Sequence, residues 1–128
     1  MRKIMLLFLA GMLGACSTQA KEESVANFTD LISDDQVYLF TLDGCPHCEQ
    51  AKSYLKRKYP NLKLQARELS DVDYRKYFYA CGMKFGLNIR HLGAPLFCMG
   101  KNYILGWDQT DEPRFDEYIK PFLKKDNH

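Results

Sequence analysis

Hydrophobic and polar positions divide the first half of the chain into a strand followed by a helix. Residues 36–42, QVYLFTL, form a nearly continuous apolar run flanked by acidic residues, which is typical of a buried strand. Residues 45–59 are rich in helix-forming side chains and contain a proline that the first helical turn tolerates. Pro60 then predicts the end of this helix.

The alternation of strands and helices continues through the next thirty residues. Residues 62–67 alternate between apolar and polar side chains, which predicts a half-buried strand. Ser70, with Asp73 three residues later, resembles a capping box at the start of a helix. That helix would carry one apolar stripe, made of Tyr74, Phe78, Cys81 and Phe85.

The C-terminal part predicts a hairpin and a last helix. Residues 95–99 and 102–105 are short apolar runs joined by Gly-Lys, which is typical of a hairpin. Thr110 is expected to cap a helix whose apolar residues recur at helical spacing: Phe115, Tyr118, Ile119 and Phe122. Residues 24–33 have similar spacing and predict a short leading helix.

These elements together predict an α/β fold. Their order is helix, strand, helix, strand, helix, strand, strand, helix. The first two strands are joined through a helix, so they should be parallel with a right-handed crossover. We therefore expect a mixed four-stranded sheet, βαβ followed by ββα, with helices on both faces.

The first 15 residues have the composition of a signal peptide. Arg2 and Lys3 precede an apolar run of about a dozen residues, which is too short to span a membrane. The run ends in Leu-Gly-Ala-Cys, with the cysteine at position 16, and this resembles the lipobox of bacterial lipoproteins. The alternative is an ordinary cleaved signal peptide with a cysteine nearby by chance.

The lipobox resemblance implies a domain organisation and a location. Residues 1–15 would be removed, Cys16 would be lipidated, residues 16–23 would form a tether, and residues 24–128 would form a single domain. A membrane-anchored lipoprotein of the bacterial cell envelope, facing the periplasm, is expected. Ser17 in place of aspartate would leave it in the outer membrane of a Gram-negative cell.

Charge excludes one class of partner. The formal net charge is +2, and Arg2 and Lys3 account for the whole excess, so the rest of the chain is neutral. Nothing in this balance indicates the basic surface that binding of nucleic acid requires. The hydrophobic fraction of 46% is ample for a packed core, and we expect a monomer.

Cys45-Pro46-His47-Cys48 is the motif that indicates chemistry. A structural zinc site needs four ligands, and the chain has no second cysteine pair at this spacing. A c-type haem tether needs histidine directly after the second cysteine, where Glu49 stands. A crosslink that closes so short a loop adds little stability, because the entropy removed grows with loop length. Redox catalysis without a metal or cofactor is therefore favoured.

The predicted place of the motif, between a strand and a helix, suits a nucleophilic thiolate. Free N–H groups and the positive end of the helix dipole stabilise an anion at Cys45, and only the thiolate attacks a disulfide. His47 as an imidazolium would favour the same form, although a solvated surface histidine is the alternative. Cys48, one turn later and more buried, is the predicted resolving thiol.

Two segments resemble a known family. VYLFTLDGCPHCEQAKSYL resembles the first strand and active-site helix of glutaredoxins and other thioredoxin-fold oxidoreductases, and GAPLFCMGKNYILGWD resembles their second hallmark. The resemblance covers about residues 35–125 and implies a thioredoxin-like fold and disulfide exchange with protein or small thiol substrates. It also implies that Pro95 is cis beside the Cys45 sulfur, with the Ala94 backbone free to pair with an extended substrate. The Pro-His dipeptide is also that of the bacterial periplasmic disulfide oxidase.

Two departures from the glutaredoxin pattern leave glutathione open as a partner. Asp43-Gly44 stands where glutaredoxins usually carry a lysine, and Gly93-Ala94 stands where they carry threonine and valine. The family uses those residues to hold glutathione. An acidic Asp43 would repel the carboxylates of that tripeptide.

Several alternatives stay open at the level of sequence. Cys81 and Cys98 are either inert thiols or a second disulfide. Both interpretations stay open because a bond needs their Cα atoms within about 7 Å, and the sequence does not give that distance. His91 and Trp107 are expected to be structural. Besides an oxidoreductase, the chain could be a binding module for a thiol-bearing partner or a soft metal such as Cu(I), or an assembly lipoprotein with a permanently oxidised pair. The direction of electron flow is not determined.

Overall fold

The computed structural model of the chain describes residues 28–123. The predicted signal peptide, Cys16 and the predicted tether lie outside these residues. Of the predicted leading helix, only residues 28–33 are described, and Phe28 and Thr29 among them are helical. Within the described range, no helix has both the length and the apolar character needed to cross a membrane.

A four-stranded mixed sheet forms the middle layer. Its strands lie in the order β2-β1-β3-β4. β1 pairs in parallel with β2 and antiparallel with β3, and β3 and β4 form an antiparallel hairpin. The strands are β1 (Val37–Thr41), β2 (Gln65–Glu68), β3 (Leu96–Met99) and β4 (Asn102–Leu105). The predicted α/β fold class, with its mixed four-stranded sheet, is confirmed.

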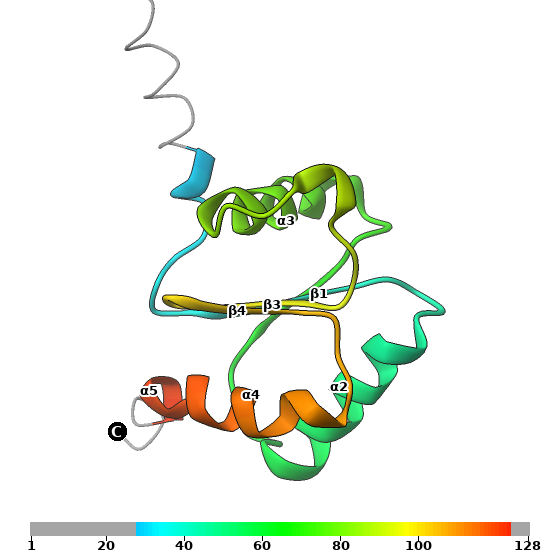
Figure 1. Cartoon of the computed structure of the whole chain (residues 1–128), viewed down its shortest axis with the longest axis vertical. Helices are drawn as coiled ribbons and strands as arrows, with labels where there is room; N and C mark the ends of the chain where they lie inside the picture. Colours follow the sequence, from blue (N-terminus) through cyan, green and yellow to red (C-terminus); the bar gives the residue numbers. More distant parts are fainter. Residues whose placement is uncertain (1–27, 124–128) are drawn as a thin grey trace, which may run out of the picture.

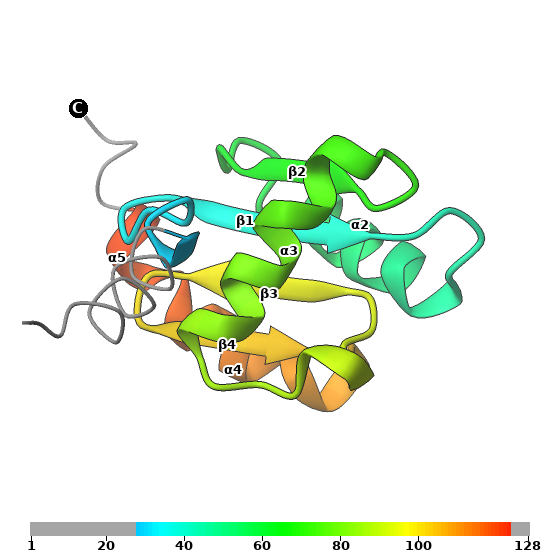
Figure 2. The ribbon, with the colours of Figure 1, turned by 90° about the horizontal axis from the view of Figure 1, so that it is seen from above.

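Helices cover both faces of the sheet, as Figure 1 shows with the sheet edge-on. One face carries α3 (Val72–Lys84), which crosses over the sheet in the view from above (Figure 2). The other face carries α2 (Pro46–Lys58), α4 (Glu112–Tyr118) and α5 (Lys120–Leu123). Two short 3-10 helices, η1 (Ile89–His91) and η2 (Gln109–Asp111), precede β3 and α4.

The two faces of β1 explain why its sequence is apolar throughout. All five of its residues are buried. Val37 and Leu39 point into the core between the sheet and helices α2 and α4, whereas Tyr38 and Phe40 point into the core between the sheet and α3. The first core contains a group of aromatic rings in mutual contact: Tyr54, Tyr59, Phe97, Trp107 and Phe115.

Strand β2 begins later than its hydrophobic pattern predicts. Leu62 and Leu64 lie in the preceding loop and pack against the core from there. The paired residues are Gln65–Glu68, and Ala66 is exposed. The alternation therefore marks side chains that cover the core, while pairing with β1 decides where the edge strand begins.

The predicted capping residues of two helices are wrong by one or two positions. Asp71, not Ser70, caps α3, and its side chain accepts a hydrogen bond from the Asp73 N–H at 2.9 Å. Asp108, not Thr110, starts the C-terminal helical region, in a reciprocal capping box with the buried Asp111. In both places an aspartate near the predicted cap has the short carboxylate that N-caps favour.

Candidate active site

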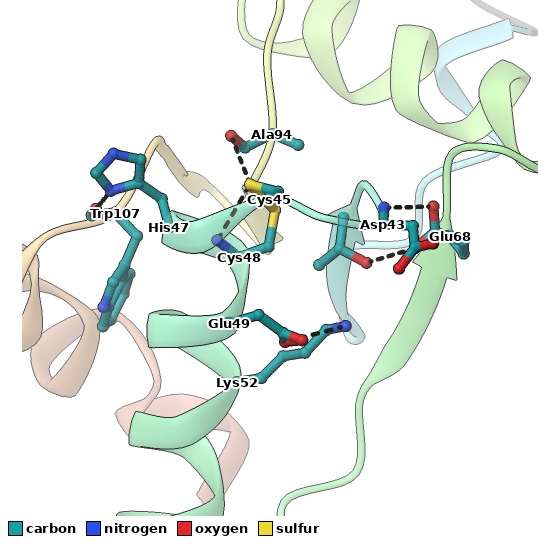
Figure 3. Close-up of a disulfide and its surroundings, with 10 residues drawn as sticks. Asp43, Cys45, His47, Cys48, Glu49, Lys52, Glu68, Ala94 and Trp107 are labelled. Atoms are coloured by element: carbon teal, nitrogen blue, oxygen red, sulfur yellow. Dashed lines mark hydrogen bonds and ion pairs between the residues drawn. A yellow bond between two sulfur atoms is a disulfide. The ribbon is translucent and has the colours of Figure 1, made fainter.

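The four residues of the Cys-Pro-His-Cys motif lie at the N-terminus of α2 (Figure 3). Cys45 is the N-cap, and its Sγ accepts a hydrogen bond from the Cys48 N–H at 3.2 Å. Pro46 occupies the first turn, where its missing N–H leaves no hydrogen bond unmade. The helix start therefore places the Cys48 N–H and the positive end of the helix dipole at the Cys45 sulfur.

Cys45 and Cys48 form a disulfide, and they differ in exposure. Their Cα atoms are 5.2 Å apart. Cys48 is completely buried, whereas Cys45 is partly exposed. An incoming molecule can therefore reach Cys45 but not Cys48. We call the Cys45 sulfur the outer sulfur and the Cys48 sulfur the inner sulfur.

The Ala94–Pro95 peptide lies beside the outer sulfur. This peptide bond is cis. The Ala94 carbonyl oxygen is 3.7 Å from Sγ of Cys45, although the two residues are 49 positions apart in sequence. The Pro95 carbonyl accepts a hydrogen bond from the Gly106 N–H at 2.8 Å, which joins this peptide to the end of β4. The structure thus brings together Cys45, Cys48, Ala94 and Pro95 at one end of the sheet.

His47 is exposed and makes its hydrogen bond to the main chain. Its Nδ1 lies 2.9 Å from the carbonyl oxygen of Trp107. A carbonyl oxygen only accepts, so Nδ1 must carry the proton, in either the neutral or the charged ring. Among residues 28–123, no hydrogen bond joins the His47 ring to the Cys45 sulfur. Any influence of His47 on that sulfur is therefore exerted through space.

The carboxylate of Asp108 lies near enough to His47 for the two charges to interact. Hydrogen bonds from Thr110 hold the pKa of Asp108 below its ordinary value, and the nearby charge of His47 acts in the same direction. Asp108 follows Trp107, whose carbonyl holds the ring. The segment after β4 thus provides both a hydrogen-bond acceptor and a negative charge for His47.

Glu68 holds the loop that leads into the motif. Its carboxylate accepts hydrogen bonds from the Asp43 N–H at 3.0 Å and the Ser70 N–H at 3.3 Å, and from the Thr41 hydroxyl at 3.4 Å. The sequence offers no sign of this role, because Glu68 reads as an ordinary polar residue at the end of an edge strand. The sequence could not predict the contact of Trp107 with His47 either, since Trp107 makes it with its backbone carbonyl oxygen, which every residue has.

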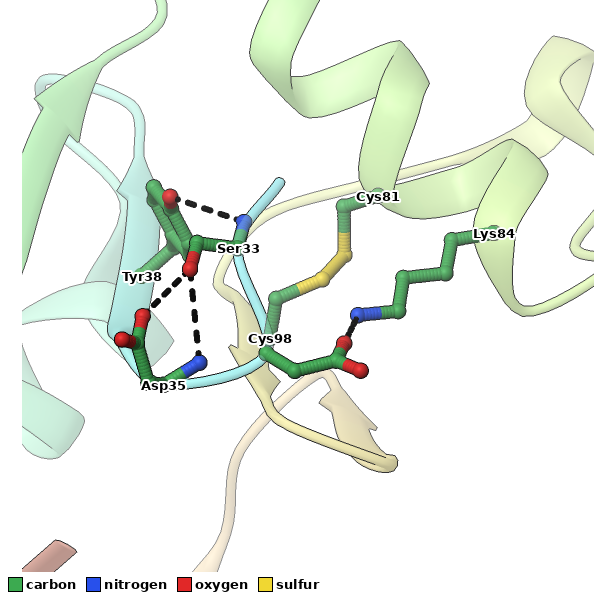
Figure 4. A network of polar contacts seen from close by, with 7 residues as sticks. Ser33, Asp35, Tyr38, Cys81, Lys84 and Cys98 are labelled. Carbon is green, nitrogen blue, oxygen red and sulfur yellow. Dashed lines mark hydrogen bonds and ion pairs between the residues drawn. A yellow bond between two sulfur atoms is a disulfide. The ribbon is translucent and has the colours of Figure 1, made fainter. Parts of the chain in front are cut away.

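A second disulfide joins Cys81 and Cys98, and Figure 4 shows it linking α3 to β3. The two Cα atoms are 6.3 Å apart, and the side chains are 0% and 1% exposed. On the surface next to this bridge, Lys84 forms an ion pair with Asp34. His91 is exposed, and its ring Nδ1 lies 2.9 Å from the side-chain nitrogen of Asn88.

The comparisons with known proteins identify the fold. No protein-family model matches the chain, and no curated protein matches it. Among solved structures, the chain is similar to a glutaredoxin from Archaeoglobus fulgidus, with 20% identity, a TM-score of 0.50, and coverage of 66% of this chain and 86% of that one.

Two plant glutaredoxins match over more of the chain. Buckwheat glutaredoxin, solved as a glutathione complex, has 18% identity and a TM-score of 0.52, with coverage of 85% of this chain and 94% of that one. Reduced glutaredoxin C1 from Populus tremula x tremuloides has 21% identity and a TM-score of 0.51, with coverage of 86% and 90%. The chain therefore has a glutaredoxin-like thioredoxin fold, with a Cys-x-x-Cys pair at the start of α2.

Proposed function

We propose that this chain is an exported thiol–disulfide oxidoreductase that works through the Cys45–Cys48 pair. The observation that carries the proposal is the asymmetry of that pair at the start of α2. The outer sulfur is partly exposed and accepts an N–H, and the inner sulfur is buried. This arrangement provides one sulfur for attack and a second one for release.

The reaction follows from that arrangement. In the reduced protein, the Cys45 thiolate attacks one sulfur of a substrate disulfide, whose other sulfur leaves as a thiolate and takes a proton. Cys48 then loses its proton and attacks the Cys45 sulfur, which breaks the mixed disulfide and releases the second substrate thiol. The substrate gains two electrons and the pair becomes a disulfide. The same steps in reverse oxidise a substrate dithiol.

The helix start favours the reactive form of Cys45. With an ordinary pKa near 8.5, only about 3% of a thiol is ionised at pH 7. The Cys48 N–H and the dipole of α2 stabilise the anion directly. His47, held by the Trp107 carbonyl, adds a positive charge close to the same helix start when it is protonated.

The Ala94–Pro95 peptide is proposed to position the substrate. Its Ala94 end lies beside Sγ of Cys45, so an extended polypeptide that paired with this backbone would carry its own sulfur to the attacking atom. We infer that the substrates are thiol- or disulfide-bearing proteins and peptides. Buckwheat glutaredoxin binds glutathione in its solved complex, but here the exposed Asp43 would oppose its carboxylates.

Export and lipid attachment at Cys16 are part of the proposal. The signal-peptide pattern of residues 1–15 supports them. The buried Cys81–Cys98 disulfide supports export independently, because structural disulfides persist in oxidising compartments and are rare elsewhere. We expect labelled palmitate to be incorporated into the full chain in bacterial cells, and Cys16→Ser to abolish incorporation. Equal labelling of the variant would refute lipidation at this position.

The experiment that tests the activity compares Cys45→Ser with the wild-type protein. The variant should lose insulin reduction and oxidation of a reduced dithiol peptide by at least about a thousandfold, since a hydroxyl is not a nucleophile toward sulfur at neutral pH. Ser53→Ala, at an exposed position of α2, is the matched control and should keep full rates. Full activity in Cys45→Ser would overturn the proposal.

The same preparations test the rival binding module. Among the described residues, no group of three or more histidine, cysteine, aspartate or glutamate side chains is arranged to hold a metal ion. Stoichiometric copper or zinc retained by the purified wild-type protein, without turnover, would replace the oxidoreductase with that function.

A further inference from the structure

The Cys81–Cys98 disulfide closes a loop that reaches the catalytic pair. Cys81 lies in α3 and Cys98 lies in β3, 17 residues apart in sequence (Figure 4). Between them the chain leaves α3, forms η1 and arrives at the Ala94–Pro95 peptide. Since the Ala94 oxygen lies 3.7 Å from Sγ of Cys45, the loop leaves the core after Cys81, passes the active site at Ala94 and Pro95, and returns to the core at Cys98.

One side of this loop is packed directly onto α3. A Cβ added at Gly82, next to the bridged cysteine, would lie 2.6 Å from Cδ1 of Leu92 and 3.3 Å from Cγ2 of Ile89. The Leu87 N–H also donates to the Gly82 carbonyl at 2.8 Å. Leu92 is two residues before Ala94, so the position of α3 determines the approach of the chain to the active site.

The other side of the loop is β3, one of the two inner strands. Cys98 lies in the middle of the sheet, opposite Tyr38 of β1 and Tyr103 of β4. The Pro95 carbonyl, at the start of this strand, is held by the Gly106 N–H. A crosslink between α3 and β3 thus joins the helix that packs against Leu92 at Gly82 to the strand that directly follows Pro95.

We propose that Cys81 and Cys98 are positioning residues for the catalytic pair. Their disulfide holds α3 against β3 and thereby sets where the Ala94 backbone lies relative to the Cys45 sulfur. The inference rests on the proposed disulfide exchange at Cys45. The bridge itself does not exchange, because both cysteine side chains are buried and a substrate sulfur has no access to them.

The alternative is a staple that raises stability and does nothing else. A staple would change the unfolding transition but leave the kinetics of the folded protein unchanged. A positioning role would change the use of an extended substrate, which needs the Ala94 backbone. It would spare a small disulfide, which needs only the Cys45 sulfur. The two explanations therefore differ in KM for one class of substrate.

The test compares Cys81→Ala/Cys98→Ala with the wild-type protein, well below the unfolding temperature of each. We expect KM for an extended dithiol peptide to rise at least about fivefold, because small displacements of positioning groups have large kinetic effects. The rate with a small aromatic disulfide should stay within about twofold. Ile119→Ala, in the core on the opposite face, is the matched control for lost stability and should keep the wild-type KM.

A second variant leaves both cysteines in place. Gly82→Ala pushes the tip of Leu92 and should raise KM for the peptide in the same direction, by a smaller factor. If the double variant does not fold, this variant decides the question. Wild-type KM in either folded variant overturns the positioning role, and the bridge is then a staple.

A readout without turnover separates this inference from the proposed function. When both proteins are reduced at the active site, iodoacetamide should label Cys45 at least about threefold faster in the double variant, because the Ala94 peptide no longer shields its sulfur. An unchanged labelling rate counts against positioning. A wild-type protein with no turnover at all overturns the proposed function, and the labelling rates still test whether the bridge sets the position of Ala94.

Discussion

The two disulfides use the same bond for opposite purposes. Cys45 and Cys48 are three residues apart, lie at the edge of the fold, and expose one sulfur. Cys81 and Cys98 are 17 residues apart, and both are buried in the core between the sheet and α3. A short loop at a helix start is easily opened and favours a thiolate, whereas a long loop in a dry core is protected and constrains the unfolded chain.

Different interactions accordingly hold the helices on the two faces of the sheet. On the α3 face a covalent bridge joins helix and strand. On the α2 face, where the cysteines must remain free to react, a polar cluster joins α2 to α4. The Tyr54 and Tyr59 hydroxyls each donate to Oδ1 of Asp116 at 2.5 Å, and Nζ of Lys58 lies 2.6 Å from Oδ2. The face that carries the reactive cysteines is thus held by hydrogen bonds and an ion pair, whereas the opposite face is held by a disulfide.

The largest expected difference is in reactivity. After mild reduction at neutral pH, Cys45 and Cys48 should be alkylated at least about a hundredfold sooner than Cys81 and Cys98, because the buried pair reacts only through transient opening of the fold. Mass spectrometry of tryptic peptides measures the order. In denaturant the difference should disappear. Simultaneous labelling in buffer would show that the second disulfide is also exchangeable.

The less reactive disulfide should contribute more to the free energy of unfolding. Removing the Cys81–Cys98 bridge by Cys81→Ala/Cys98→Ala should cost about 3 kcal/mol, and removing the active-site bridge by Cys45→Ala/Cys48→Ala about 1 kcal/mol less, because loop length sets the entropy term. For a domain of this size, 3 kcal/mol lowers Tm by roughly 12–24 °C. Denaturant unfolding under non-reducing conditions measures both. Equal losses of unfolding free energy in the two double variants would show that the buried disulfide stabilises the fold no more than the active-site disulfide does.

A smaller effect concerns the polar cluster that replaces a bridge on the α2 face. Burial raises the pKa of Asp116, but hydrogen bonds from Lys58, Tyr54 and Tyr59 outweigh it, so the pKa lies below its ordinary value. A carboxyl with a depressed folded pKa contributes stability above its unfolded pKa, near 4, and loses it as pH falls through the folded value. Wild-type Tm should therefore drop between about pH 5 and the folded pKa of Asp116.

The matching variant is Asp116→Asn. It should lose about 1–2 kcal/mol at neutral pH, because both tyrosines and the lysine lose a charged acceptor. Its acid-induced loss of Tm should be shallower than that of the wild-type protein. Glu117→Gln, the next residue and an exposed one, is the control and should follow the wild-type curve. Identical curves for Asp116→Asn and wild type would show that the cluster does not hold α2.

The smallest expected change concerns His47 and affects only the reactive disulfide. His47→Gln keeps an N–H for the Trp107 carbonyl but removes the charge that the ring places near the helix start when it is protonated. The reduction potential of the Cys45–Cys48 pair should become more negative by about 30 mV, which is tenfold in the exchange equilibrium. Titration against a glutathione buffer measures it. A potential unchanged in the variant would make His47 a surface residue without influence on the pair.

Much of the fold could be predicted because it is encoded in local patterns. β1, α2, the β3–β4 hairpin and the stripe of α3 all follow from periodicity and from proline and glycine positions. The start of β2 and the caps Asp71 and Asp108 were missed, since neighbouring residues of similar propensity compete and tertiary pairing decides among them. Two further differences are the 3-10 helix η1, which no sequence pattern indicated, and the division of the predicted last helix into α4 and α5.

The sequence by itself determined the chemistry that this chain can perform. The spacing of Cys45 and Cys48 and their place between a strand and a helix are readable from residue types and local pattern, and the resemblance to glutaredoxins adds Pro95. These features depend on short-range interactions, which a single sequence reveals.

Only the tertiary structure decided what surrounds and supports that chemistry. It pairs Cys81 with Cys98, brings the Trp107 carbonyl to His47 across 60 positions, and ties Tyr54 to Asp116 across 62. The physical reason is that such contacts arise from packing of distant segments, and a backbone carbonyl is the same in every residue. Whether two cysteines meet depends on a few ångströms of helix placement, which no spacing in the chain records.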